Sequence, residues 1–530
     1  MTNGRGRSSA GRARLGAGHI TRGEKLTKIA CLIGSACAAL ALAGAAHGAL
    51  SVGVTDDRGR DNPSSFFAAL TDIGLSQNRV SIAWDPAQPN VIGGQAAIES
   101  WLPLAQTTGV RVVFAIGPKT ATALTSSPSA PSEFAAFVKQ VAQAFPQVKD
   151  YVIGNEPNQP VFWKPQYDGA GKPLSAAAYE PVLARSYDAL KAVDPTIRVI
   201  GVGLSPRGND NPHAKSNVSR SPVRFLHELG LAYRASGRTK PLMDELAFHP
   251  YPLKNTDPPF VGYAWPNAGL ANLDRIKQAV WDAFNGTAQP TFAETGASSF
   301  TPPLRLELDE IGWQVAILPG LAGLYTGTET IPTIDEATQA GYYADAIRAA
   351  ECDPTVSSLS FFLLLDEPQL SRWQSGLERL DGSHRPSYTT VKQVIADTDG
   401  TCRDSLVSWT HTGGLVASRV TWGDLRRKRT TRTTRWSFAA GAKEEAVFRA
   451  GIFKAGTTRH TIAAQLVRGN PKAVLAVAGK IKAKNRVVAF PARKLKKGRY
   501  VFAIRMQATM NPARVTIVVS SSFRVSAPLR

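Results

Sequence analysis

The feature that most constrains the fold of this chain is an alternation of short β-rich runs with longer segments of helical periodicity. Between the runs lie helix-like segments such as 132–145 and 177–193, and in the second of these the apolar residues fall roughly on one helical face. Repeated βα units form a parallel sheet, and eight of them predict an α/β fold, a closed (β/α)8 TIM barrel over residues 49–402. A doubly wound open sheet is the alternative, but no glycine-rich phosphate loop opens any of the expected helices. The expected strands are 50–57, 78–84, 110–116, 150–156, 197–204, 244–251, 290–296 and 357–367.

The pattern changes after Cys402. Helical periodicity fades, and strand-like runs separated by turn residues predict an all-β sandwich over residues 403–530. The stretches 495–500 and 523–525 resemble an immunoglobulin-like module of bacterial surface proteins. The expected strands of this part are 445–453, 460–467, 473–481, 486–491, 498–508 and 514–525.

The pattern of residues 1–48 indicates an export signal. A basic stretch that ends at Lys28 precedes the apolar run 29–46, and Ala46-His47-Gly48 offers a cleavage site. An uncleaved membrane anchor is the alternative, because the apolar run approaches the length that spans a bilayer. We expect cleavage, and hence a secreted or cell-envelope protein.

Charge divides the chain into the same three parts. Residues 1–48 hold 7 basic side chains and 1 acidic one. Residues 49–402 hold 28 basic and 36 acidic side chains, and residues 403–530 hold 27 basic and 4 acidic ones. Basic runs can bind phosphate backbones, but no nucleic-acid-binding motif accompanies them. We therefore expect no nucleic-acid partner. The basic part either binds an anionic cell-envelope polymer or presents a solvated charged surface.

Two cysteines, Cys352 and Cys402, follow the leader. In an exported protein such a pair can form one disulfide, which here would covalently fix the segment that closes the barrel. A cysteine zinc site and thiol catalysis are not expected, because no other cysteine is available. The sequence implies neither a metal nor an organic cofactor.

Two glutamates stand at the ends of expected strands. Asn155-Glu156-Pro157 ends the fourth strand, and Ala293-Glu294-Thr295 ends the seventh. Barrel strands present their C-terminal residues to the active-site face, so both carboxyls should point into the mouth. Hydrolysis of a glycosidic bond requires such a pair, with one carboxyl protonated and the other ionised. Glu156 and Glu294 are therefore the predicted catalytic pair.

Together with His249-Pro250-Tyr251 at the end of the sixth strand, these motifs give residues 50–395 a resemblance to glycoside hydrolase clan A. Within the clan, the chain is most similar to the cellulase-like families five and thirty-nine. The resemblance implies a retaining hydrolase that cleaves O-glycosyl bonds of a β-linked glycan by double displacement. It makes Glu156 the acid/base and Glu294 the nucleophile.

The resemblance also implies which residues surround the sugar. Arg79, on the second strand, would favour the ionised form of the nucleophile, and Tyr251 would hydrogen-bond it. A tryptophan platform that the clan often has on the eighth strand is replaced here by Phe361-Phe362, so Phe362 or Trp373 would take its place. The other expected contacts to the substrate are Asn155, Trp163 and His249.

Each of these assignments has a structural alternative. Glu294 could cap a helix, Arg79 and His249 could be ordinary core residues, and Trp163 could serve packing rather than stacking. Asp366-Glu367-Pro368 repeats the acid/base motif and is interpreted as a cleft-rim or structural pair. For the whole chain, the alternative to a monomeric enzyme acting on an oligo- or polysaccharide is a non-catalytic envelope or polysaccharide-binding protein on a degenerate barrel.

Overall fold

The structure is a computed structural model. It describes residues 49–297, 302–412, 426–429, 434–442, 444–467, 473–481, 486–491, 495–511, 514–520 and 522–525. The expected export signal at 1–48 lies outside the described residues. Within these ranges, no helix has both the length and the apolar character needed to cross a membrane.

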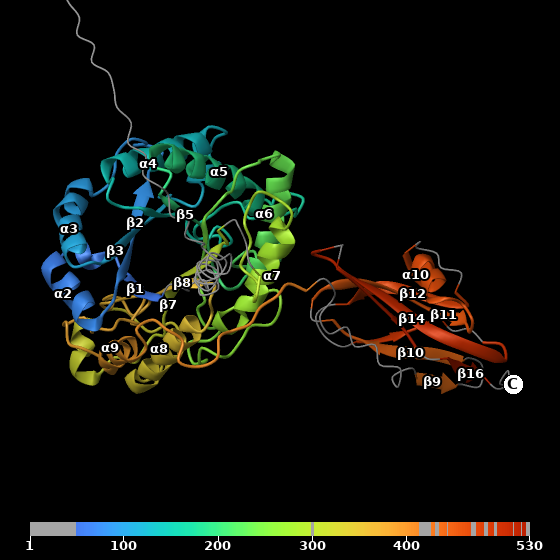
Figure 1. The fold of residues 1–530 in the computed structure, drawn as a ribbon. Helices are drawn as coiled ribbons and strands as arrows, with labels where there is room; N and C mark the ends of the chain where they lie inside the picture. The colour runs from blue at the N-terminus through green and yellow to red at the C-terminus, as the bar shows by residue number, and fades with distance from the viewer. Residues whose placement is uncertain are drawn as a thin grey trace, which may run out of the picture. The chain divides into compact units, whose positions relative to one another are not determined.

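Eight parallel strands close into a barrel (Figure 1), which confirms the predicted fold. Neighbouring strands pair in chain order, and β8 returns to β1 with Val54 opposite Phe361. The strands are β1 (Ser51–Thr55), β2 (Gln77–Trp84), β3 (Arg111–Pro118), β4 (Asp150–Ile153), β5 (Arg198–Leu204), β6 (Glu245–Phe248), β7 (Arg305–Ile311) and β8 (Val356–Phe361).

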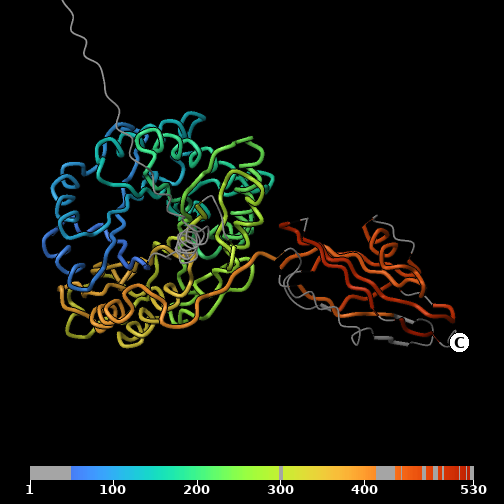
Figure 2. Tube along the Cα trace, viewed as in Figure 1, coloured from blue at the N-terminus to red at the C-terminus, as the bar shows by residue number. Residues whose placement is uncertain are grey.

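Helices surround the strands, as the ribbon and the Cα trace of this part show (Figures 1 and 2). Short 3-10 turns lie at Arg58–Arg60, Ala123–Thr125, Leu270–Asn272 and Pro319–Leu324. The helices are α2 (Pro63–Ile73), α3 (Gln95–Thr107), α4 (Ala130–Ala144), α5 (Ser175–Val193), α6 (Pro222–Ser236), α7 (Leu273–Phe284), α8 (Glu336–Glu351) and α9 (Pro386–Thr398).

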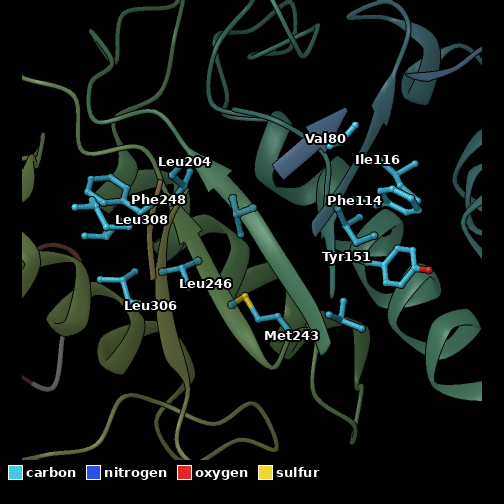
Figure 3. Close-up of a cluster of buried hydrophobic side chains, with 14 of the residues drawn as sticks. Val80, Phe114, Ile116, Tyr151, Leu204, Met243, Leu246, Phe248, Leu306 and Leu308 are labelled. Carbon is cyan, nitrogen blue, oxygen red and sulfur yellow. The ribbon is translucent and has the colours of Figure 1, made fainter. Parts of the chain in front are cut away.

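The barrel strands bury side chains on both faces. Residues that point outward, such as Phe114, Tyr151 and Leu308, belong to the large core beneath the helices (Figure 3). Their neighbours along the strands point inward, because successive side chains of a strand alternate. Five small or β-branched residues form a separate cluster on the inner side: Val113, Ala115, Val152, Ile200 and Ala247. Burial on both faces holds a parallel sheet in place and leaves its C-terminal end for a site.

The prediction for the seventh strand is wrong. Around 290–296 the chain makes only an isolated bridge, Phe292 to Leu304, and the barrel strand is Arg305–Ile311. This strand carries acidic residues into the barrel interior, where Glu307 accepts a hydrogen bond from Gln77 Nε2 at 2.9 Å. A search for apolar runs misses such a strand.

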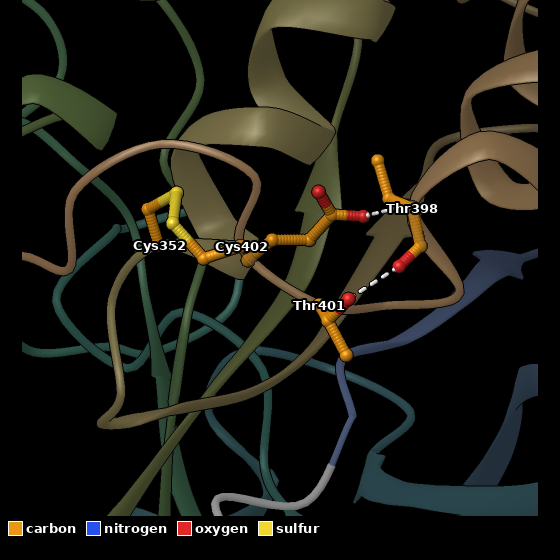
Figure 4. Close-up of a disulfide and its surroundings, with 5 residues drawn as sticks. Cys352, Thr398, Thr401 and Cys402 are labelled. Carbon is orange, nitrogen blue, oxygen red and sulfur yellow. Dashed lines mark hydrogen bonds between the residues drawn. A yellow bond between two sulfur atoms is a disulfide. The ribbon is translucent and has the colours of Figure 1, made fainter.

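The disulfide between Cys352 and Cys402 is present, which confirms the predicted pair (Figure 4). It joins the end of α8 to the segment after α9, across a sequence separation of 50 residues. Close by, Thr401 Oγ1 donates to the carbonyl of Thr398 at 2.6 Å. The chain then continues along the barrel: Val407 N donates to Cys352 O at 2.7 Å, and Trp409 is buried in the barrel core. The domain boundary expected at 402/403 stays a prediction.

Removing this disulfide is expected to destabilise the protein by about 2–4 kcal/mol, because the bond closes a loop of roughly fifty residues in the unfolded chain. The measurement is urea denaturation of the Cys352→Ser/Cys402→Ser protein beside the oxidised wild type. Adding a reductant to the wild type should reproduce the loss and should leave the double variant unchanged. Equal midpoints for all samples would contradict the expectation.

The C-terminal part, taken by itself, is a β-sandwich, as predicted. One sheet has the order β13-β10-β9 and the other β12-β11-β14-β15, with β16 paired to β14. Aromatic side chains of the two sheets meet in one core, where the rings of Phe438 and Phe502 are 4.8 Å apart. The elements are β9 (Arg426–Arg429), β10 (Thr434–Ala440), β11 (Ala446–Lys454), α10 (Arg459–Val467), β12 (Leu475–Ile481), β13 (Arg486–Ala489), β14 (Gly498–Ala508), β15 (Val515–Val519) and β16 (Phe523–Val525).

One expected strand of the sandwich is wrong. Residues 460–467 lie in the helix α10, where Ile462 and Leu466 are spaced four residues apart and share one face. Both side chains are buried with Phe453 and Ala503, beside the main core of the sandwich.

Candidate active site

A cavity of about 1000 Å³ lies at the C-terminal end of the barrel strands. Its walls come from residues at or after β1, β2, β3, β4, β5, β6, β7 and β8. In (β/α)8 barrels this end of the strands is where active sites are built. Among its lining residues are Arg79, Asn155, Glu156, Tyr251 and Trp373, as expected from the sequence, and also Glu310.

Glu156 follows β4 in a backbone conformation that the neighbouring strand supports. Its φ is 40°, in the left-handed region that residues other than glycine seldom adopt. Its N–H donates to the carbonyl of Gly203 at 2.8 Å. Gly203 and Val202 also have positive φ values, 58° and 80°, at the point where β5 and β6 shift register. Such local strain, held by surrounding structure, is typical of functional sites.

Glu310 stands near the end of β7, where the pairing with β8 is irregular. Its carboxylate binds two side chains: Arg79 Nη1 lies 2.9 Å from Oε1, and the Tyr251 hydroxyl donates to Oε2 at 3.1 Å. Arg79 Nη2 also donates to Asn155 Oδ1 at 2.8 Å. One buried guanidinium therefore connects the ends of β4 and β7.

His249 brings the two glutamates together. Its Nδ1 lies 2.9 Å from Glu156 Oε1 and 3.5 Å from Glu310 Oε2. The two carboxylate oxygens are therefore at most 6.4 Å apart, the sum of these two distances. On the other side of the ring, His249 Nε2 faces Asp309 Oδ1 at 3.2 Å. The side chain is fully buried, so His249 lies beneath the cavity and not in its wall, where the sequence had placed it.

The charges around His249 decide its protonation. Burial by itself would lower the pKa of the imidazole, but the carboxylates of Glu310 and Asp309 raise that pKa to about 10. Burial raises the pKa of Glu310, while the positive charges of His249 and Arg79 oppose this rise. At neutral pH the site thus holds an imidazolium and a guanidinium among three carboxyl groups, from Glu156, Asp309 and Glu310.

The structure does not bring Glu294 to this site. Glu294 is absent from the cavity wall, and its Oε1 accepts the backbone N–H of His411 at 3.1 Å. The His411 imidazole also contacts this oxygen and stacks on Trp281 with ring centroids 3.9 Å apart. Arg79 and Tyr251, expected beside Glu294, contact Glu310 instead. The expected position of the second carboxyl in the mouth is therefore corrected to Glu310, because β7 begins after residue 294.

Trp163 is a packing residue and not part of the cavity wall. Its side chain is 2% exposed and packs edge-on against Tyr179, with ring centroids 5.7 Å apart. The neighbouring Phe162, 38% exposed, lines the cavity in its place. Of these two adjacent rings in the loop after β4, the structure places Phe162 in the cavity wall and Trp163 in the core.

Two further aromatic rings, those of Trp373 and Phe362, line the cavity together with Tyr251. Trp373 lies 4.7 Å from Tyr251 and 5.5 Å from Phe362, measured between ring centroids, and all three line the cavity. Phe362 directly follows β8, so the aromatic surface expected near that strand is present without a tryptophan on the strand itself. Rings of this kind present flat apolar faces to a ligand.

Asp366 and Glu367, expected to be a cleft-rim or a structural pair, have one of these roles each. Asp366 is fully buried, where it binds Arg385 Nη1 at 2.7 Å and the Tyr325 hydroxyl at 2.8 Å. Glu367 lines the cavity and accepts the N–H of Trp373 at 3.0 Å. The first is thus structural, and the second belongs to the cavity rim. Among the residues that the structure describes, no cluster of three or more His, Cys, Asp or Glu is arranged to hold a metal ion.

No protein-family model matches the chain, and no curated protein is similar to it in sequence. A family 39 glycoside hydrolase from Bacteroides cellulosilyticus is 14% identical over 84% of this chain and 81% of that chain, with a TM-score of 0.46. A β-xylosidase from Caulobacter crescentus is 13% identical over 83% of this chain and 93% of that chain, with a TM-score of 0.41. A glucosidase from Croceicoccus marinus is 12% identical over 83% of this chain and 92% of that chain, with a TM-score of 0.43. At these identities and TM-scores, the likeness carries no conclusion about this chain.

Proposed function

We propose that this protein is a retaining glycoside hydrolase of the clan A type, with Glu156 as acid/base and Glu310 as nucleophile. The observation that carries the proposal is the pair of carboxylates, at most 6.4 Å apart between the two oxygens that face His249, in a cavity of about 1000 Å³. Retaining enzymes hold their carboxyls about 5–5.5 Å apart, whereas inverting enzymes leave room for a water between them.

The surroundings of the two carboxyls favour this division of roles. Glu310 accepts hydrogen bonds from Arg79 and Tyr251, which stabilise its ionised form for attack on the anomeric carbon. Glu156, in its protonated form, gives its proton to the glycosidic oxygen as the bond to the leaving group breaks. The resulting ester between the sugar and Glu310 is then hydrolysed by a water that gives its proton to Glu156.

The test is hydrolysis of a panel of nitrophenyl β-glycosides and β-linked oligosaccharides by wild type and three matched variants. Glu310→Gln should fall to background on every substrate. Glu156→Gln should lose about 10²–10⁴-fold on substrates with poor leaving groups, which need the proton most. Glu294→Gln should retain wild-type activity, because its carboxylate binds His411 away from the cavity. Activity lost in Glu294→Gln and kept in Glu310→Gln would reverse the assignment.

External azide separates the two roles. In Glu310→Gly, azide should attack the anomeric carbon in place of the missing carboxylate and give a glycosyl azide of inverted configuration. In Glu156→Gly, azide should replace the second water and give the retained configuration, since the ester to Glu310 still forms. Product stereochemistry is read by nuclear magnetic resonance. An absence of turnover on the whole panel by the wild type would favour a non-catalytic glycan-binding protein.

The finer features of the protein are part of the same proposal. We infer a β-linked glycan as substrate, an exported monomer, and a C-terminal sandwich that binds an anionic envelope polymer. The Cys352–Cys402 disulfide supports an oxidising compartment, and the 27 basic against 4 acidic residues of 403–530 support a polyanionic partner. Co-sedimentation of the protein with envelope polymers, at rising salt, tests the last point.

A further inference from the structure

Five cations and five carboxyl groups line the cavity that holds Glu156 and Glu310, and three of the cations pair with carboxylates of the same wall. Among its cations, Arg58 pairs with Asp56 at 2.8 Å, Arg79 with Glu310 at 2.9 Å, and Arg372 with Glu367 at 3.6 Å. Two lining cations remain: Arg207 and Lys254. Within the part of the chain that the structure describes, neither has a carboxylate within 4.0 Å of its charged nitrogens.

These two cations share one stretch of the wall. Arg207 follows β5 and Lys254 follows β6, and Arg207 Nη1 donates to the carbonyl of Leu253, the residue before Lys254, at 2.9 Å. Both side chains are exposed to the cavity solvent. The loop that bears Lys254 therefore holds the Arg207 guanidinium. Asp257, on the same loop, accepts the backbone N–H of Lys254 at 3.2 Å and pairs with neither charged group.

The wall is held in place beneath them. The buried side chain of Gln159 donates to the carbonyl of Arg207, and Gly208 N donates to Asn267 Oδ1 at 2.9 Å. Ala268 N donates to the carbonyl of Pro206 at 3.0 Å. Loops after β4, β5 and β6 are thus tied together around Arg207, and these bonds hold the backbone from which its side chain extends.

The same wall lies on the Glu156 side of the cavity. Gln159, which holds Arg207, is three residues after Glu156. Burial raises the pKa of Tyr263, the charge of Arg207 opposes this rise, and the charges of Asp257 and Glu156 add to it. The Tyr263 hydroxyl donates to the carbonyl of Tyr251, a residue of the cavity wall, at 2.9 Å. Because Glu156 would protonate the leaving oxygen, this side receives the leaving part of the glycan.

We propose that Arg207 and Lys254 form a subsite for an acidic sugar, which binds the carboxylate of a uronic acid residue or a sulfate ester on the leaving-group side of the scissile bond. The inference rests on the proposed glycosidase function, whose substrate class it names. Arg and Lys both favour such anions, and an arginine fork can bind both oxygens at once.

The test compares pairs of glycans that differ only in charge. The pairs are cello-oligosaccharides with β-1,4-oligoglucuronates, and manno-oligosaccharides with β-1,4-oligomannuronates, while sulfated cello-oligosaccharides distinguish sulfate from carboxylate. Binding is measured by titration calorimetry on the full-length Glu310→Gln protein, so that no substrate is consumed. At least one acidic member should bind about tenfold or more tightly than its neutral partner, and the gain should shrink as salt rises.

Removing the two charges should remove the preference. In the Glu310→Gln background, Arg207→Gln/Lys254→Gln should bring the acidic glycan down to the affinity of its neutral partner. Lys240→Gln, on the loop between α6 and β6 at the other end of the barrel, is the matched control for lost charge and should keep the preference. The inference is overturned if neutral glycans bind as well as acidic ones, or if the double variant weakens both members of a pair equally.

Turnover separates this inference from the function on which it rests. If the wild type cleaves neutral glycans as fast as acidic ones, the glycosidase stands and the acidic subsite is wrong. If acidic glycans bind through Arg207 and Lys254 but no glycan is cleaved, the subsite stands and the glycosidase is wrong. If no acidic glycan binds in any pair, the subsite is wrong whatever the turnover.

Discussion

Replacement of Arg79 by methionine is expected to destabilise the protein by about 3–5 kcal/mol and to lower kcat/KM at least about a hundredfold. Arg79 is 2% exposed and lies 3.0 Å from Asp309 and 2.9 Å from Glu310. Without it, two buried carboxylates keep only His249 as a cation, and leaving a buried charge without its partner is among the costliest changes a core can undergo. Urea denaturation and steady-state kinetics measure the two losses separately.

Two controls make the Arg79 result specific. Arg79→Lys keeps the charge but loses the fork that reaches Glu310 and Asn155 together, so it should regain much of the stability and little of the activity. Arg348→Met removes a half-exposed arginine that pairs with Asp345 at 3.7 Å, and it should change stability by less than about 0.5 kcal/mol. An Arg79→Met protein as stable and active as the Arg348→Met protein would show that the buried ion pairs carry neither property.

Most of the barrel was predictable because its strands follow a simple rule. Runs of apolar residues between helical segments mark seven of the eight strands, since strands covered on both faces are nearly continuous in apolar residues. The seventh breaks the rule: its inward residues Glu307 and Asp309 are acidic, and their partners Gln77 and His249 lie far away in the sequence. The available signal was the alternation of Leu306 and Leu308 with these acids, a period of two that marks a strand with two different faces.

The candidate site was predictable in part, for a related reason. Residues at strand ends, such as Glu156 and Tyr251, could be placed from the strand count, and the resemblance to clan A added Arg79, which lies within β2. Glu310 could not be placed, because an error in one strand moves every residue on it. In the loop after β4, periodicity gives no help, so nothing in the sequence tells which of Phe162 and Trp163 faces the cavity.

His249 illustrates what only the three-dimensional arrangement supplies. From the sequence it is one polar residue after a strand, and its contacts come from β4 and β7 as well as its own β6. Glu156, Asp309 and Glu310 surround the ring and keep it charged. The positive charge lies between the two proposed catalytic carboxyls, so its removal should be visible in the pH dependence of the reaction.

Replacement of His249 by asparagine is therefore expected to shift the acid limb of the pH profile of kcat/KM to higher pH by at least about one unit. The imidazolium, with its pKa of about 10, is charged throughout the working range and favours the ionised form of Glu310. Asparagine is neutral, so the Glu310 carboxyl should take up its proton at higher pH. The acid limb reports ionisation of the nucleophile, so this limb should move.

Asp309→Asn supplies a control of opposite sign. The negative charge of Asp309 raises the pKa of Glu310, so its neutralisation should move the acid limb to lower pH, while the carboxyls of Glu310 and Glu156 keep His249 charged. A merely structural role for either residue would lower kcat at all pH values and leave the limbs in place. Shifts of the same sign in both variants, or no shift in His249→Asn, would contradict the account of a charged histidine that favours the ionised form of Glu310.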